Sequence, residues 1–93
     1  MQGKGTAMNK IKCMLLDEVL AHPRGKPVSL QEIAAALDIS QRMVRIYWGE
    51  IEKFLSQHSL GHMFILQNAA VSFVGSRMDE QRLHRALMAM DMY

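Results

Sequence analysis

Cysteine is almost absent from this sequence, and that scarcity limits the chemistry available to it. Cys13 is the only cysteine among 93 residues, so no internal disulfide can form. The four histidines are scattered along the chain, and no cysteine or histidine spacing suits a zinc site. We therefore expect neither a metal nor any other cofactor.

Long apolar runs are missing as well. No stretch approaches the roughly 18 consecutive apolar residues that are needed to cross a bilayer. The N-terminus also lacks the basic and then apolar pattern of a secretion signal. These two absences predict a cytoplasmic protein without a membrane partner.

No arrangement of residues suggests catalysis. Asp17 with Glu18, and Asp79 with Glu80, are adjacent acidic pairs, whose side chains diverge on a helix and cannot share one substrate. A glycine-rich phosphate loop is lacking, and Cys13 has no visible activating base. We expect a protein that is not an enzyme.

Charged residues are missing from the whole segment between Lys53 and Arg77. The formal net charge of +2 is compatible with nucleic-acid binding but is shared by many other soluble domains. Because eight of the eleven basic residues precede residue 54, any phosphate-binding surface should come from the first half of the chain.

The composition that is present is that of one folded domain. Hydrophobic residues make up 49% of the chain and charged residues 22%, which is ordinary for a globular protein. A chain of 93 residues has room for a single small core. We expect a flexible N-terminal segment over residues 1–8 and one domain over residues 9–93.

Apolar spacing predicts four helices. The first covers residues 9–21, the third residues 41–57 and the last residues 77–91, with a short second helix that starts after Ser29 and stops before Asp38. In the third helix, spacings of four, three and four mark an inner face made of Val44, Trp48, Ile51 and Leu55. Ser29 and Ser40 are typical N-caps, and Glu32 and Asp79 complete capping boxes with Ser29 and Ser76.

A β-hairpin separates the third and fourth helices. Phe64 and Leu66 would share a face opposite Val71 and Phe73, across a four-residue turn at residues 67–70, and Val28 would add a strand of one or two residues. The predicted fold is therefore mainly α with a small β-hairpin. This is a winged helix-turn-helix: a three-helix bundle, a β-wing and an extra C-terminal helix.

The segment from Leu30 to Ile51 carries the main functional signal. A helix-turn-helix needs a small residue where its helices cross, which Ala34 provides. Four positions later it needs a residue that tolerates left-handed backbone, and Asp38 is one of the few non-glycine types that do. Apolar anchors surround the turn at Ile33, Leu37, Ile39 and Val44. An ordinary pair of packed helices is the alternative interpretation.

These residues also resemble a family. Residues 40–45, Ser-Gln-Arg-Met-Val-Arg, resemble the Ser-x-Arg-Thr-hydrophobic-Arg start of recognition helices in bacterial winged regulators. Residues 64–83 are similar to the strand, glycine and acidic helix start of Mga-type virulence regulators and of regulators controlled by the sugar phosphotransferase system. The resemblance covers about residues 9–88. It implies the N-terminal DNA-binding domain of a bacterial transcription regulator, followed by regulatory domains.

The sequence departs from the family pattern within the third helix. Met43 stands where Thr or Ser is common, and Ile46 and Tyr47 replace a frequent Arg-Asp pair. Gly49 interrupts the helix at a cost of about 1 kcal/mol relative to alanine.

Double-stranded DNA is the predicted partner. Gln41, Arg42 and Arg45 would point away from the core; glutamine can pair with adenine and arginine with guanine, while the same arginines can instead grip phosphate. Tyr47 would either reach the sugar-phosphate backbone or pack on the first helix. The predicted DNA-contacting residues are Arg24, Lys26, Ser29, Gln31, Ser40, Gln41, Arg42, Arg45 and Tyr47, with Lys10 and Lys12 as further candidates for the electrostatic rim.

Two other functions fit the same pattern. A winged-helix module that binds protein and no DNA is favoured by the uncharged hairpin and the nine methionines. The DNA-binding front end of a bifunctional enzyme, as in biotin-ligase repressors, is the other. Leu83, Leu87 and Met90 predict one apolar stripe on the last helix, and Met88 and Met92 a second. A helix apolar on two sides is expected to pack also on a twin subunit or on missing regulatory domains.

Overall fold

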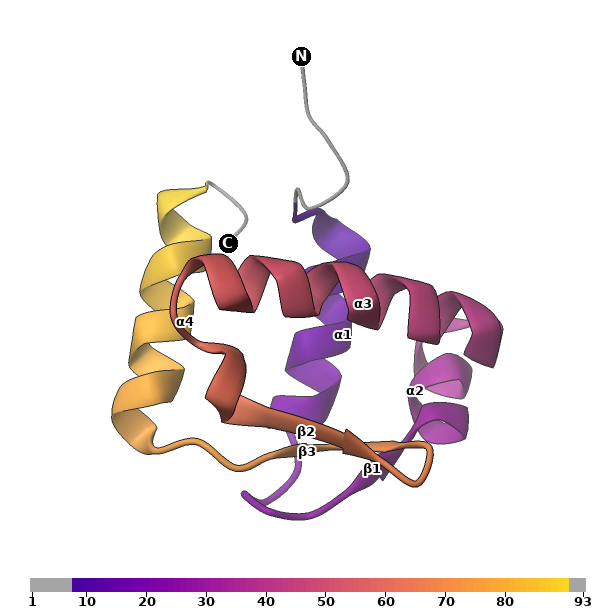
Figure 1. Cartoon of the computed structure of the whole chain (residues 1–93). Coiled ribbons are helices and arrows are strands. Elements are labelled where there is room, and N and C mark those ends of the chain that lie inside the picture. Colours follow the sequence, from indigo (N-terminus) through magenta and orange to yellow (C-terminus); the bar gives the residue numbers. More distant parts are fainter. Residues whose placement is uncertain (1–7, 91–93) are drawn as a thin grey trace.

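A computed structural model describes residues 8–90 of the chain. The structure consists of four α-helices and a small antiparallel sheet of three strands, with strand order β1-β3-β2 (Figure 1). The elements in chain order are α1 (Lys10–Leu20), β1 (Val28–Ser29), α2 (Leu30–Leu37), α3 (Gln41–Gln57), a 3-10 turn (Gly61–Met63), β2 (Phe64–Gln67), β3 (Ala70–Phe73) and α4 (Arg77–Ala89). The mainly helical class and the predicted order of elements are confirmed, although the 3-10 turn was not predicted.

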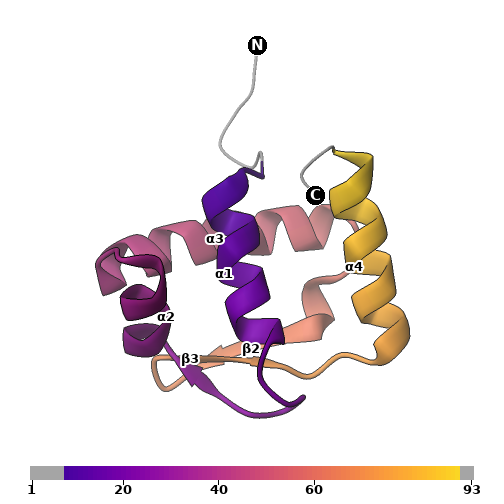
Figure 2. The ribbon, with the colours of Figure 1, turned by 180° about the vertical axis from the view of Figure 1, so that it is seen from behind.

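The sheet lies beneath the helices, and α2 and α4 stand at opposite ends of the molecule (Figure 1). Helix α3 runs across the front of the molecule from α2 towards α4. Seen from behind, α1 passes in front of α3 and stands between α2 and α4 (Figure 2). The start of α3 is therefore at the α2 end, far from α4.

Serine caps begin three of the helices, as the sequence predicts. The hydroxyl oxygens of Ser29, Ser40 and Ser76 accept hydrogen bonds from the backbone N–H groups three residues ahead, at 3.0, 3.1 and 3.1 Å. A complete capping box forms only at Ser76, where Asp79 reaches back to the Ser76 N–H at 3.0 Å. The box predicted for Glu32 is only half present, because the recorded capping bond there is the one from the Glu32 N–H to Ser29.

The hairpin has the predicted pairing but a shorter turn. Phe64 pairs with Phe73 and Leu66 with Val71, and β1 joins the other side of β3. The strands continue through Gln67 and Ala70, so the turn is two residues rather than four. Asn68 and Ala69 both adopt left-handed backbone, with φ of 55° and 57°, which is the geometry of the tight turns that match strand twist.

One core fills the space between the helices and the sheet. The Phe64 ring lies 5.4 Å from Trp48 of α3 in an edge-to-face contact and 5.4 Å from Phe73 of β3. Met8 is also buried in this core, so the domain begins at least one residue before the predicted boundary; residues 1–7 of the predicted flexible segment lie outside the described residues.

The C-terminal helix is buried less than predicted. Leu83 and Leu87 are fully buried, but Met90 is 38% exposed and does not continue their stripe. The reason is that α4 ends at Ala89, and Met90 is its C-cap. Met88 is exposed as predicted, and Met92 lies outside the described residues. Within residues 8–90, the structure contains no helix long and apolar enough to span a membrane.

Lys12 is a structural residue and not part of an electrostatic rim. Its side chain is only 5% exposed, and its Nζ lies 2.6 Å from Oε1 of Glu50, so the pair joins α1 to α3. Glu50 keeps about a third of its side chain in water. An ammonium group can be buried in this way only when an opposite charge compensates for lost hydration.

Glu50→Gln should therefore destabilise the domain by roughly 2–3 kcal/mol, just below the range for breaking fully buried pairs, because Glu50 is partly exposed. Lys12→Met is the matched partner, since it removes the buried charge and keeps the length of the side chain. The double variant should be about as stable as Lys12→Met alone, because Glu50 then has no charge to compensate. Urea unfolding measures all three; additive losses would contradict this account.

Asp79 ties the start of α4 to the turn before β2. Its Oδ2 accepts from the Ser76 N–H and lies 3.1 Å from Nε2 of His62, while Arg82 approaches Oδ1 at 3.5 Å. The hydrogen bond from the Ser76 backbone is the largest cause, and it lowers the pKa of Asp79 below its ordinary value of 3.8. Loss of hydration opposes this shift as the second-largest cause, and the His62 contact then lowers the pKa further. The charged carboxylate is therefore the form that the folded state favours.

The sign of this shift predicts a pH dependence. Because the folded-state pKa is depressed, the stabilisation is fully present above the ordinary value and is lost as the pH falls below 3.8 through the folded-state pKa. Asp79→Asn should lower the urea midpoint at pH 6 but change it much less at pH 3. Glu32→Gln, at the equivalent position of α2, is the control and should not reproduce this pH dependence. An Asp79→Asn effect of equal size at both pH values would contradict the prediction.

Candidate nucleic-acid interface

Helices α2 and α3 are joined by a tight turn with the predicted geometry. Ala34 is buried where the helices approach each other. Asp38 has φ 57° and ψ 47°, the left-handed conformation expected at its position, and the Ile39 N–H donates to the Ala34 carbonyl at 3.0 Å. Ser40 then starts α3. This turn fixes the direction in which α3 leaves α2.

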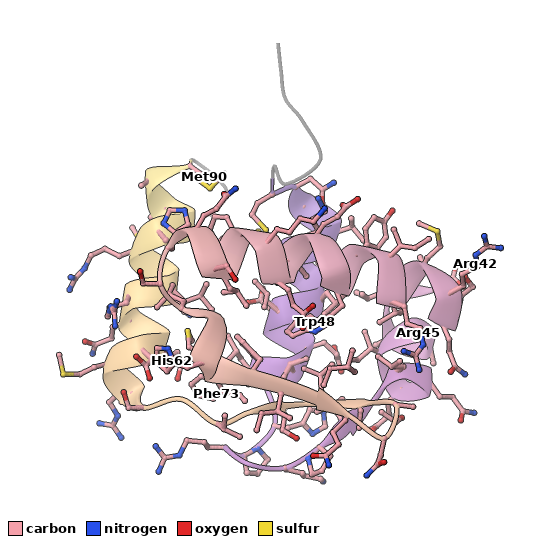
Figure 3. The ribbon with its side chains drawn as sticks, in the orientation of Figure 1. Arg42, Arg45, Trp48, His62, Phe73 and Met90 are labelled. Atoms are coloured by element: carbon pink, nitrogen blue, oxygen red, sulfur yellow. The ribbon has the colours of Figure 1, made fainter. Side chains whose placement is uncertain are left out.

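The exposed start of α3 carries a glutamine and two arginines. Gln41, Arg42 and Arg45 are all exposed. Figure 3 shows the Arg42 guanidinium beyond the N-terminal end of α3, the Arg45 guanidinium just below that end of the helix, and Trp48 further along beneath α3. Within residues 8–90 neither arginine forms an ion pair, so their donors face solvent. These three predicted residues are brought together on one surface.

A second stripe on α3 mirrors the buried one. Each of its residues stands two positions before a residue of the buried face, so the spacing of four, three and four is the same. Two positions correspond to about 200° around the helix, which places this stripe on the outer side. They are Arg42, Ile46, Gly49 and Lys53. Lys53 is not among the residues that the sequence predicts to contact DNA, although counting the same spacing on the outer face places it on this stripe.

The predicted contacts at the start of α2 are partly engaged within the protein. The Ser29 hydroxyl oxygen caps Glu32, and the Leu30 N–H donates to the Ala69 carbonyl of the hairpin turn at 2.9 Å. Gln31 is exposed, and the Ser40 hydroxyl accepts from the Met43 N–H at its own helix start. The side chain of Gln31 and the hydroxyl proton of Ser40 remain suitable donors to phosphate.

The remaining predicted contacts lie elsewhere. Arg24 donates from Nη1 to the Gly75 carbonyl at 3.3 Å, which places its guanidinium beside the start of α4. Lys26 is exposed in the loop before β1, and Lys10 is exposed at the start of α1. Tyr47 is half-buried and packs against the core, on the side of α3 away from Arg42. The hydrogen bond of Arg24 and the packing of Tyr47 engage these two side chains within the protein, whereas Lys10 and Lys26 remain exposed.

The hairpin turn reaches α2 but carries no charge. Gln67 and Asn68 are exposed at its tip, and the bond from Leu30 holds the turn against the start of α2. Two amides can bond phosphates but add little to salt dependence, since only neutralising charges release counterions. The tip is therefore a weak contact at most.

Removing both tip amides should weaken DNA binding by less than about 1 kcal/mol, the net scale of one hydrogen bond. Because Asn68 has positive φ, alanine there would strain the turn, so the variant is Gln67→Ala with Asn68→Gly. Fluorescence anisotropy on a labelled duplex measures the affinity. A loss of tenfold or more, with the melting temperature unchanged, would show that the tip is a major contact.

Ala69→Gly is the matched control for the turn. It removes no hydrogen-bonding side chain and relieves alanine from a φ of 57°. Its stability should rise by about 1 kcal/mol, with no change in affinity.

Other chemistry has little support in the described part of the chain. Residues 8–90 contain no group of three or more side chains suited to holding a metal ion. Cys13 is buried on α1, and burial raises the pKa of its thiol, with a smaller contribution from Asp17. A thiol with a raised pKa is a poor nucleophile at neutral pH.

The outer face of α4 is basic as well as apolar. Arg77, Arg85 and Met88 are exposed there and line a hollow of about 440 Å³ together with Glu80, Gln81 and His84. This face carries two arginines, one glutamate and an exposed methionine, so its charge pattern neither favours nor excludes the predicted homodimer through α4. The dimer stays a prediction.

Comparisons with protein-family models, with curated proteins and with solved structures found no match to this chain. The case for a function therefore depends on the geometry of the α2–α3 unit and the surface around Arg42.

Proposed function

We propose that this chain is a winged helix-turn-helix that binds double-stranded DNA in a sequence-specific manner. In this proposal it is the DNA-binding domain of a cytoplasmic bacterial transcription regulator, with α3 as the recognition helix and the hairpin as the wing. The observation that carries the proposal is the exposed pair Arg42 and Arg45 at the start of α3, held by a tight turn with left-handed Asp38.

The binding mode follows from the docking of such helices. The recognition helix enters the major groove with its N-terminal residues against base edges, while the preceding helix crosses the backbone. Gln41, Arg42 and Arg45 would meet bases or flanking phosphates, and Gln31 and Ser40 would donate to phosphate. Lys53, further along the same face of α3, would add a charge along the groove.

Selection of bound sequences from a random duplex library tests this proposal. We expect enrichment of one motif, and a labelled duplex carrying it should bind more weakly as salt rises. Only three neutralised phosphates would give about a 40-fold loss of affinity between 50 and 200 mM salt. No enrichment together with no salt-sensitive affinity would contradict DNA binding.

Absence of DNA binding would favour a protein-interaction module instead. The observation behind this alternative is the outer face of the sheet, where Ile65 and Val74 are 47% and 40% exposed beside an open hollow of about 430 Å³. No charged residue lies among its lining residues. A role as the DNA-binding front end of a bifunctional enzyme would leave the DNA contacts of this domain unchanged.

A further inference from the structure

Two residues on the outer stripe of α3 are poor choices for an exposed helix. Ile46 is 44% exposed and is the only large apolar side chain of α3 that is. Gly49 follows three residues later in the middle of the same 17-residue helix. A β-branched residue loses side-chain freedom in a helix, and glycine has the lowest helix propensity of any residue except proline. Neither residue stabilises the helix that contains it.

The protein interior does not require either residue. A Cβ atom added to Gly49 would meet nothing within 4 Å, so no neighbouring element needs the glycine in order to pack. An exposed hydrophobic residue by itself needs no explanation. Here, however, two unfavourable residues are one helical turn apart on the surface that carries Arg42 and Lys53, and such local conflicts are typical of functional surfaces.

The surroundings of these residues indicate what approaches them. Along the stripe, a cation (Arg42) is followed by an apolar side chain (Ile46), by a residue without a side chain (Gly49) and by a second cation (Lys53). An open hollow of about 580 Å³ lies on this face and is lined by Gly49, Glu52, Lys53, Ser56 and Gln57. The hollow itself holds one cation, Lys53, and one carboxylate, Glu52. The stripe, however, carries Arg42 and Lys53 on either side of Ile46 and Gly49, so a polyanion with an apolar group on its surface fits the stripe. In the major groove of DNA, that apolar group is the 5-methyl of thymine.

We propose that Ile46 recognises the methyl group of a thymine in the major groove, and that Gly49 allows the DNA to approach α3 closely. This inference rests on the proposed DNA-binding function and adds a base preference to it. It assigns one position of the bound site to a T·A pair, read by contact with carbon rather than by hydrogen bonds. It also favours DNA over RNA, because uracil lacks the methyl group and the RNA major groove is too narrow for a helix.

Replacing thymine by deoxyuridine removes this methyl group and leaves every hydrogen-bonding atom of the base pair in place. Each thymine of a duplex selected by the wild-type protein is replaced in turn, and anisotropy measures the affinity. At one position we expect the wild-type protein to lose at least about fourfold, the effect of one buried methyl-sized group. Ile46→Ala should bind the thymine and deoxyuridine duplexes equally.

Ile65→Ala is the matched control, because Ile65 is similarly exposed but lies on the outer face of the sheet. It should keep the full sensitivity to the methyl group. Gly49→Ala provides an independent readout: its melting temperature should rise by about 4–8 °C, while its affinity for the same duplex should fall by tenfold or more.

The outcomes separate this inference from the proposed function. A wild-type protein that binds its selected duplex but loses nothing at any deoxyuridine position would overturn the role of Ile46 alone. The role of Ile46 would also be overturned if Ile46→Ala lost as much affinity as the wild-type protein when thymine is replaced by deoxyuridine. Unchanged affinity of Gly49→Ala would overturn the close approach. Failure of the wild-type protein to bind any duplex would instead overturn the DNA-binding proposal and this inference with it.

Discussion

Replacing Arg42 and Arg45 together by alanine is expected to abolish sequence-specific DNA binding and to leave the fold intact. Each arginine that pairs with a guanine discriminates by about 1–3 kcal/mol, so the pair together should change specific affinity by roughly 30-fold to 20,000-fold. Both side chains are exposed and form no ion pair within residues 8–90, so their loss should change stability little. Anisotropy on the selected duplex measures the first effect, and circular dichroism with thermal melting measures the second.

Arg77→Ala with Arg85→Ala is the matched control. It removes the same amount of charge from α4, at the opposite end of the molecule from the start of α3 (Figure 1). If general electrostatic attraction explains binding, both double variants should weaken it similarly. If α3 reads bases, the α4 variant should keep its preference for the selected duplex over a scrambled one. An Arg42/Arg45 variant that binds as tightly as the wild type would contradict the assignment of α3.

Single arginine-to-lysine variants then separate the two roles that the sequence leaves open. Lysine keeps the charge but cannot form the two parallel hydrogen bonds that arginine makes with guanine. Arg42→Lys or Arg45→Lys should lose specificity wherever the arginine contacts a base, and should keep it wherever the arginine contacts phosphate.

Local features of the fold were predictable from the sequence because they depend on neighbouring residues. Ser40 and Ser76 cap helices through bonds that span only three residues. Asp38 adopts left-handed backbone because few other side chains tolerate it between two helices. The alternating residues of the hairpin gave its register, since one face had to enter the core.

Features that depend on distant residues were not predictable in the same way. Lys12 looked like a surface cation until α3 brought Glu50 to within 2.6 Å of it. Arg24 was a candidate DNA contact, but the fold places the Gly75 carbonyl, 51 residues away in sequence, within its reach. The spacing of residues in the sequence does not show which lysine or arginine will pair with an acceptor that is distant along the chain.

The candidate site falls between these cases. Arg42 and Arg45 were identified because neither belongs to the inner-face spacing of Val44, Trp48 and Ile51. Arg42 lies about 200° around the helix from Val44, and Arg45 lies about 100° from it on the flank of the helix. The meaning of Gly49 required the structure, because only the space around its missing side chain shows that no internal contact demands it.

Phe73→Ala is expected to cost about 3–5 kcal/mol of stability, the usual effect of truncating a core aromatic residue. Phe73 is 6% exposed, and its ring contacts Phe64, which in turn contacts Trp48. These three rings connect the hairpin to α3, so their contacts are lost together. Since small domains are stable by only about 5–15 kcal/mol, the variant should be close to unfolding at 37 °C. Urea unfolding at 10 °C measures the loss.

Two further variants serve as controls for the loss of stability in Phe73→Ala. Ser72→Ala changes the neighbouring residue on the opposite face of β3 and should alter stability by less than about 0.5 kcal/mol. Phe73→Leu leaves a smaller cavity, should be less destabilised than Phe73→Ala, and should bind the selected duplex like the wild-type protein at 10 °C. A folded Phe73→Leu protein that had lost DNA binding would show that the hairpin contacts DNA. If Phe73→Ala were instead as stable as the wild-type protein, the contacts between Trp48, Phe64 and Phe73 would contribute little to the fold, and the hairpin would not be an essential part of the core.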